Sequence, residues 1–524
     1  MKKYLIILIA SLLFGGSIFA QTHNWTYNNA NYSDNMTAAL WVTLDGNYLD
    51  DPTIEVAAFV DEEVRMSEFM QDLNPSGSNV FEHLFIWGSI GLSQSGETIT
   101  FKMFYNNTEY DICPVTVTGV INGEAGTMDD PLVLNFYSPI TKDITAYTPN
   151  TPNNETPDHY YLIASPIGQV SPTLVGQMLN NSYDLYYYDQ TQDKEWINYE
   201  GSNGNFSLEP GKGYLYANSQ NVTLTFAGAP YSGNGEVPLV YDAGVNQNTA
   251  LIGWNLVGNP FAQPAYIADN RSFYRMNEGG TGLISASGAI AAMEGVFVKA
   301  ADADDNNITF STEQPSRSGE QLTVNLSQNR GAAIDRVIIG FSEGDVLPKF
   351  MLNENNAKLY IPQGNVDYAV VRSAGVGELP LNFKASKNGT YTLSIDTENM
   401  EMNYLHLIDN MTGMDIDLLQ TPSYSFEAST RDYASRFRLV FAGTSTDATS
   451  SDAFAFYSNG NWIINNPSTG SGVATLQIVD VNGHLLCNEQ INGCCSKSFE
   501  AAPGVYMLRL INGENVKTQK IVVR

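Results

Sequence analysis

Tyrosine side chains crowd one short segment of this chain, where they could bind a sugar or a peptide side chain by stacking. The segment reads YDLYYYD over 183–189. Alternate side chains of a strand point to opposite faces, so Tyr187 faces away from its two neighbours. An exposed aromatic face binds rings, whereas a buried one is ordinary sheet core. The candidate contact residues are Tyr186, Tyr188, Trp196 and Tyr199.

An acidic loop offers a second kind of chemistry. The run DADDNN at 302–307 supplies Asp302, Asp304 and Asp305. Calcium is bound by several carboxylate and carbonyl oxygens from one loop, so these residues are the candidate Ca²⁺ ligands. A related turn, ANSQN at 217–221, carries no acid, which indicates that the turn forms without a metal. We therefore expect no cofactor, with Ca²⁺ at this loop as the alternative.

Groups for catalysis are sparse. The five histidines show no HxH or HExxH spacing, and the GxSxG motif of serine hydrolases is absent. His406 lies in a strand-like segment, where packing is the simpler interpretation and a role as general base is the alternative. Distant carboxylates can still meet in a folded glycosidase. The sequence therefore favours a non-catalytic binding or structural protein, with an extracellular hydrolase of glycans or peptides as the alternative.

The elements that must position these residues are short strands. Aromatic residues make up 11 % of the chain, and 44 glycines and 22 prolines divide brief alternating runs of apolar and polar residues. This pattern predicts an all-β protein built from several β-sandwich, immunoglobulin-like modules in tandem. The expected modules are 21–137, a duplicated region at 138–316, a sandwich of eight strands at 320–444, a linker at 445–452 and a terminal module at 453–524.

The duplicated region repeats three blocks in one order. HYYLIASPIGQ (159–169) matches GWNLVGNPFAQ (253–263), and SYDLYYYD (182–189) matches RSFYRMNE (271–278). LEPGKGYLYANSQNVTLTFAG (208–228) then matches AAMEGVFVKAADADDNNITFST (291–312). Matching blocks in order predict two similar strand-rich units, about 159–228 and 253–312, that pack together. The first copy carries most of the aromatic rings, so we expect Tyr188 or Trp196 to be at least partly exposed.

The first residues have the pattern of a secretory signal peptide. Two lysines precede an apolar run and small residues, which predicts cleavage after Ala20. The formal net charge of −30 argues against nucleic acid as a partner. Acidic and basic residues are equal in number from 451 onward, so the terminal module is neutral and the acidic excess lies before it.

The terminal module ends in two strand-like runs around Asn512 and Gly513. It carries INNPSTGSGVATLQIVDVNGHLL, and then PGVYMLRL and KTQKIVVR. In this order and register, the segment closely resembles the type A C-terminal sorting domain of the type IX secretion system of Bacteroidetes. The residues that carry the resemblance are Asn466, Pro467, Gly470, Asp480, Asn482, Gly483, Pro503, Gly504, Tyr506, Lys520 and Val523.

The resemblance implies a route and a set of partners. The cargo would cross the periplasm, bind the type IX secretion machinery, and lose the terminal module to its sorting peptidase near the linker. It would then be released or attached to surface lipopolysaccharide, so the expected location is secreted or outer-membrane surface. The ligand of the cargo would be a glycan or a protein.

The four cysteines do not form a framework for so long a chain. Cys113 has no partner nearby in the sequence and is interpreted as a small buried apolar residue. Cys487 could pair with Cys494 or Cys495, or stay reduced, because spacing alone does not determine disulfide geometry.

Overall fold

The computed structural model describes most of the chain, in sixteen segments. The described residues are 25–72, 82–147, 159–201, 205–242, 249–315, 320–329, 331–353, 355–373, 376–398, 402–443, 454–458, 460–464, 473–492, 495–498, 501–513 and 515–523. The predicted signal peptide, the linker at 445–452 and Cys494 lie outside them.

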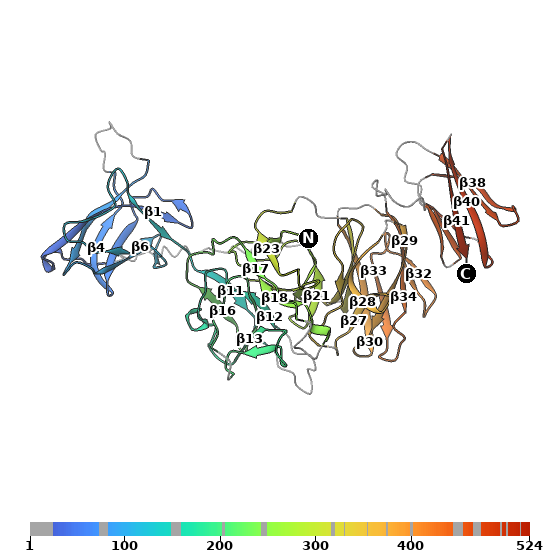
Figure 1. Cartoon of the computed structure of the whole chain (residues 1–524), viewed down its shortest axis with the longest axis horizontal. Helices are drawn as coiled ribbons and strands as arrows, with labels where there is room; N and C mark the ends of the chain where they lie inside the picture. Colours follow the sequence, from blue (N-terminus) through green and yellow to red (C-terminus); the bar gives the residue numbers. More distant parts are fainter. Residues whose placement is uncertain are drawn as a thin grey trace, which may run out of the picture. The chain divides into compact units, whose positions relative to one another are not determined.

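Strands dominate these segments, and the prediction of an all-β protein is confirmed (Figure 1). The helices in the described residues are single 3-10 turns: η1 (Asn29–Asn31), η2 (Pro172–Leu174) and η3 (Thr249–Leu251). Across the described part of the chain, no helix has the length and apolar character required to cross a bilayer. The chain divides into two compact units, residues 1–140 with 227–230, and residues 141–226 with 231–524.

The first unit contains two sheets. One has β10, β1 and β2 in that order, and β5 and β9 also pair with β1; the other has β4, β3, β6 and β7, and β8 pairs with β6. Buried side chains of both sheets, such as Leu40 and Phe101, form one apolar core. The strands are β1 (Asp34–Leu44), β2 (Asn47–Tyr48), β3 (Glu55–Val60), β4 (Glu63–Phe69), β5 (Ile86–Leu92), β6 (Thr98–Tyr105), β7 (Thr108–Tyr110), β8 (Val117–Thr118), β9 (Glu124–Ala125) and β10 (Leu132–Phe136).

The second unit begins with the duplicated region. Its first copy has a four-stranded sheet in the order β12, β15, β13 and β14, and β11 pairs with β16. Its second copy has a four-stranded sheet in the order β18, β22, β20 and β21, and β23 pairs with β17 and β19. The strands of the first copy are β11 (Ile140–Ile144), β12 (Tyr161–Ala164), β13 (Tyr183–Tyr188), β14 (Trp196–Asn198), β15 (Gly213–Asn218) and β16 (Val222–Phe226). Those of the second copy are β17 (Glu236–Pro238), β18 (Trp254–Gly258), β19 (Tyr266–Ile267), β20 (Phe273–Met276), β21 (Leu283–Ala286), β22 (Gly295–Lys299) and β23 (Asn307–Ser311).

The next module, at 321–443, is one continuous sheet of eleven strands rather than the eight strands expected. It encloses a single large apolar core that includes Leu326, Phe383 and Phe437. Its path is β32, β31, β34, β29, β27, β28, β25, β24, β30 and β33, and β26 pairs with β28. The strands are β24 (Gln321–Gln328), β25 (Ala333–Gly340), β26 (Leu347–Pro348), β27 (Lys358–Gln363), β28 (Val366–Arg372), β29 (Val376–Lys384), β30 (Gly389–Glu398), β31 (Met402–Asp409), β32 (Met414–Asp417), β33 (Ser423–Ala428) and β34 (Phe437–Gly443).

The terminal module has a three-stranded sheet, β35, β36 and β39, and a four-stranded sheet, β38, β37, β40 and β41. Trp462 and Tyr506 pack against each other in its core, with ring centroids 5.1 Å apart. The strands are β35 (Ala455–Ser458), β36 (Asn461–Ile464), β37 (Val473–Asp480), β38 (Leu485–Asn492), β39 (Cys495–Ser498), β40 (Gly504–Asn512) and β41 (Asn515–Val523).

Candidate functional site

The two copies of the duplicated region pair their strands in the same register. In the first copy, Ala164 of β12 lies opposite Gly213 of β15; in the second, Gly258 of β18 lies opposite Gly295 of β22. The strand orders of the two four-stranded sheets also correspond one for one. Equivalent residues of the two copies can therefore be assigned from the register itself.

This register corrects one detail of the sequence match. The match of SYDLYYYD with RSFYRMNE pairs Tyr186 with Arg275. In the sheets, however, Tyr186 lies opposite Leu215, and Tyr274 lies opposite Phe297, the equivalent of Leu215. The second block is therefore shifted by one residue, and the partner of Arg275 in the first copy is Tyr187.

The copies meet in a reciprocal way. Ile163 of the first copy pairs with Glu294 of the second, and the equivalent residues Val257 and Lys212 pair in return. Close approach at this seam requires glycine: a Cβ atom added at Gly213 would lie 2.6 Å from the Val257 carbonyl oxygen. The backbone on either side of Lys212 is therefore held by the other copy.

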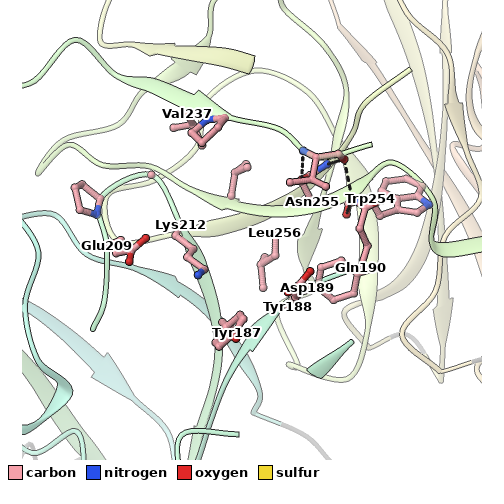
Figure 2. A pocket seen from close by; sticks show the side chains of 15 residues that line it. Tyr187, Tyr188, Asp189, Gln190, Glu209, Lys212, Val237, Trp254, Asn255 and Leu256 are labelled. Carbon is pink, nitrogen blue, oxygen red and sulfur yellow. Dashed lines mark hydrogen bonds between the residues drawn. The ribbon is translucent and has the colours of Figure 1, made fainter. Parts of the chain in front are cut away.

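A pocket lies beside this seam, with a volume of 320 Å³. Its wall comes from the end of β13, the turn before β15, β17 and β18, so both copies contribute to it (Figure 2). Val237 and Leu256 supply apolar surface, and Asp189, Glu209 and Lys212 supply charge. This combination suits a small ligand that has both apolar and polar faces.

Two amide side chains make part of the wall rigid. Gln190 is buried and donates to the carbonyl oxygens of Val240 and Trp254, at 2.7 and 2.8 Å. Asn255 accepts a hydrogen bond from the Val240 amide at 2.8 Å and donates to the Val240 carbonyl at 2.9 Å. These bonds tie β13, β17 and β18 together, so the pocket has a defined shape before any ligand arrives.

Lys212 is the cation of the pocket. Its ammonium nitrogen lies 4.2 Å from the centroid of the Tyr187 ring, and Figure 2 shows the side chain directed toward that ring. The Tyr187 ring is held in turn by Phe206, whose centroid is 5.0 Å away at nearly a right angle. In the described part of the chain, this ring is the one charge-stabilising contact found for the Lys212 ammonium group.

The second copy has different chemistry at the same two positions. Arg275 replaces Tyr187, and Glu294 replaces Lys212. The Arg275 guanidinium donates to both carboxylate oxygens of Glu294, each at 2.9 Å. The second copy thus supplies its own counter-ion where the first copy leaves a cation against a ring.

The four aromatic candidates do not form one surface. Tyr188 is 8 % exposed, and it packs on Trp196 and on Phe297 of the second copy. Tyr199 is also 8 % exposed, on the other side of the sheet beside Phe206. Trp196 and Tyr186 keep partly exposed side chains. Packing between the copies, which strand alternation does not reveal, directs Tyr188 inward.

Tyr188 nevertheless lines the pocket. Its hydroxyl group is buried and has no hydrogen-bond partner among the residues that the structure describes. Burial raises the pKa of this hydroxyl well above its ordinary value, so it stays protonated. An unsatisfied buried hydroxyl costs about 1 to 3 kcal/mol, which makes it a polar group available to a water or a ligand.

Two of the three calcium candidates have carboxylates that are engaged within the protein. Asp305 accepts two hydrogen bonds from the Arg271 guanidinium, at 3.0 and 2.9 Å. Asp302 accepts from the backbone amides of Asp304 and Asp305, which closes the turn. No cluster of three or more His, Cys, Asp or Glu side chains suited to a metal occurs among the described residues. Calcium at this loop stays a prediction from the sequence alone.

Within the sorting-like segment, Asn466, Pro467 and Gly470 lie outside the described residues. Asp480 accepts from the amides of Asn482 and His484, at 2.8 and 2.9 Å, and thereby closes the turn between β37 and β38. Gly483 has a φ of +82°, which favours glycine at this turn.

The remaining sorting-motif residues surround β40 and β41. Tyr506 is buried and donates to the Ala502 carbonyl at 2.8 Å, next to Pro503 and Gly504. Lys520 on β41 is exposed. The residues described here thus shape turns and the core, while the exposed side chain of Lys520 is available for outside contact.

The other reactive groups have structural surroundings. His406 contacts Asp415 at 2.6 Å and stacks on Tyr404. Cys113 and Cys487 are free in the structure, and burial raises the pKa of the Cys113 thiol to about 11. Neither arrangement resembles an activated nucleophile with its base.

Sequence reasoning missed Tyr187 and Lys212. The signal was present in the repeat, because Lys212 and Glu294 precede the matched glycines with opposite charges. A comparison by charge would have found it. Comparison of the chain with protein-family models and with curated proteins gave no match.

Proposed function

We propose that this chain is an exported, non-catalytic binding protein, delivered to the cell surface or secreted by type IX secretion. The observation that carries the binding role is the pocket at Lys212. The two copies share their strand register, yet only the first has the Lys212–Tyr187 pair, where the second has its own ion pair. The fold that the two copies share does not require this difference in side chains. We therefore place the ligand at the first copy.

The export route rests on the signal-peptide pattern and on the sorting-like segment. One feature of the fold supports it: β41 lies at the end of its four-stranded sheet among the described strands. A strand at an edge can be captured by strand addition, which suits recognition by a secretion machinery. The partners in this proposal are the secretion machinery, its sorting peptidase and, for an anchored cargo, surface lipopolysaccharide.

A glycan array probed with residues 21–524 tests the binding role, beside a broad panel of glycosidase and peptidase substrates. The expected result is binding of a glycan class without turnover. Turnover of any substrate, removed by substitutions in the Lys212 pocket, would instead support an extracellular hydrolase. The control is Lys194→Gln, which changes an exposed lysine of the same copy that does not line the pocket.

A further inference from the structure

The second copy shows what the Lys212 position lacks. There, a bidentate pair matches the Arg275 cation with the Glu294 carboxylate. In the first copy the cation is Lys212, and the facing residue is an aromatic ring instead of a carboxylate. Lys212 is partly exposed, and a ring attracts its ammonium group more weakly than a carboxylate would. Lys212 thus occupies the position of Glu294, and among the described residues its ammonium group has no ion pair with Asp189 or Glu209, the two carboxylates that line the pocket.

We infer that the ligand supplies a carboxylate to Lys212, and that the pocket takes a sugar ring bearing an acid group. This inference rests on the proposed binding function and names its ligand class. The ligand carboxylate would accept from the Lys212 ammonium group, in the role that Glu294 has for Arg275. A protein carboxylate at position 212, as in the second copy, would reject the same ligand by repulsion.

The rest of the pocket explains why the ligand is a sugar instead of a fatty acid. Asp189 and Glu209 line the same pocket, and carboxylates accept hydrogen bonds from hydroxyl groups. Val237 and Leu256 offer an apolar wall for the C–H face of a ring. The buried hydroxyl of Tyr188 adds a polar group without a partner among the described residues. The volume of 320 Å³ lies at the small end of ligand pockets, which span about 300 to 1,000 Å³.

The net charge of the whole chain opposes binding of anions at long range, so contacts inside the pocket must provide the affinity. A net charge of −30 repels polyanions at long range. At 0.15 M salt the screening length is about 8 Å, so contacts inside the pocket act while the distant charges are screened. We therefore expect short acidic sugars to bind better than long acidic polymers, and we choose physiological salt for the test.

The experiment measures binding of galacturonic acid and glucuronic acid to residues 21–524 by calorimetry and ligand-observed NMR. The methyl ester of galacturonic acid keeps the ring and removes the charge. We expect both acids to bind and the ester to bind about tenfold more weakly, because the ester oxygen still accepts a hydrogen bond but no longer carries the opposite charge. Lys212→Gln should weaken binding of the acids by about tenfold or more, and Lys194→Gln should leave it unchanged.

The most specific variant transfers the ion pair of the second copy to the first, and we call it the graft. The double substitution Tyr187→Arg with Lys212→Glu rebuilds the ion pair that the second copy already accommodates, so the fold has a precedent for it. We expect acid binding to be lost while the melting temperature stays near that of the unmodified chain. Single Lys212→Gln, at a partly exposed position, provides a second folded variant if the graft fails to fold.

The outcomes separate the two proposals. Equal binding of acids and ester, or acid binding insensitive to Lys212→Gln, overturns the acid-sugar inference and leaves a sugar pocket in place. Absence of acid binding, together with an array ligand that the graft abolishes, overturns the inference and keeps the proposed binding site. Array binding insensitive to the graft, or absence of any ligand, overturns both.

Discussion

At the scale of single residues, the eleven-stranded module contains two buried ion pairs, Lys349 with Asp335 and Arg436 with Asp409, and the second also contacts aromatic rings. The Arg436 guanidinium donates to both carboxylate oxygens of Asp409, with a shortest distance of 2.9 Å. Their side chains are 2 % and 0 % exposed. The Phe426 and Phe437 rings lie 4.5 and 5.2 Å from the guanidinium carbon. Arg436 thus connects Asp409 to the aromatic core. Both side chains are shielded from water, so water does not replace either partner if the other is removed.

Asp409→Asn should destabilise this module by about 3 kcal/mol, at the lower end for a broken buried pair, because only the longer contact of Arg436 with the partly exposed Asp432, at 3.4 Å, remains. Differential scanning calorimetry of the full mature chain measures the change in the corresponding transition. The matched control is Asp367→Asn, which breaks a more exposed pair with Lys358 in the same module. Such a pair contributes about 0 to 1 kcal/mol. Equal losses for both variants would contradict the role assigned to burial.

The same pair predicts a dependence on acid. Burial acts to raise the pKa of the Asp409 carboxyl, but the hydrogen bonds and charge of Arg436 outweigh it and hold the pKa below the ordinary value. A lowered folded-state pKa stabilises the fold above the unfolded pKa of about 4, and this stabilisation is lost as pH falls through the folded value. The melting-temperature gap between unmodified chain and Asp409→Asn should therefore narrow from pH 5 to pH 2. A gap that stays constant would contradict the shift.

At the scale of elements, the seam between the two copies depends on how closely their strands approach. A Cβ atom added at Gly258 of β18 would lie 2.4 Å from the Ala164 Cβ atom and 2.7 Å from the Lys212 carbonyl oxygen. Both contacts are shorter than real Cβ atoms tolerate, and one is to backbone. The seam also places Lys212 in its pocket, so the packing of β18 and the geometry of the candidate site are linked.

Gly258→Ala should destabilise the duplicated region by about 1 to 3 kcal/mol, the usual cost of overpacking a tight contact. Calorimetry of the mature chain measures the loss, and binding of the array ligand should weaken in parallel. Gly168→Ala is the control, because a Cβ atom there would meet nothing within 4 Å. If Gly258→Ala leaves the stability unchanged, the strands at the seam can move apart at little cost in free energy, and this prediction is wrong.

At the scale of the whole molecule, the modules differ in charge and in the role proposed for each. The acidic excess belongs to the residues before 451, where the candidate pocket also lies. The neutral terminal module holds its own core of residues such as Trp462 and Leu508. A module with its own core can be recognised by a secretion machinery and then cleaved off without unfolding the rest of the chain.

Deletion of residues 451–524 should leave the cargo in the periplasm, because the resemblance to a sorting domain lies wholly in this segment. Fractionation and surface labelling in a host that carries type IX secretion measure the distribution. The control fuses 451–524 to an unrelated exported reporter, which should reach the surface. Normal delivery of the truncated chain would refute the proposed route.

The sequence by itself determined what depends on local pattern. Alternating runs between turn residues required strands, and the repeated blocks required two related units in one order. The turn of Asp480 and Gly483 could be predicted for the same reason, because the hydrogen bond and the glycine that form it lie within a few residues of each other. These features need no knowledge of distant contacts.

The tertiary structure alone decided which side chains meet. Hydrogen-bond register, not residue likeness, made Tyr187 the equivalent of Arg275 and moved the match by one position. Packing of one copy on the other buried Tyr188 and left a pocket beside Lys212, from four segments that are distant in sequence. Strand alternation assigns side chains to faces, but it does not say what covers each face. That depends on packing between distant segments, and the candidate site lies there.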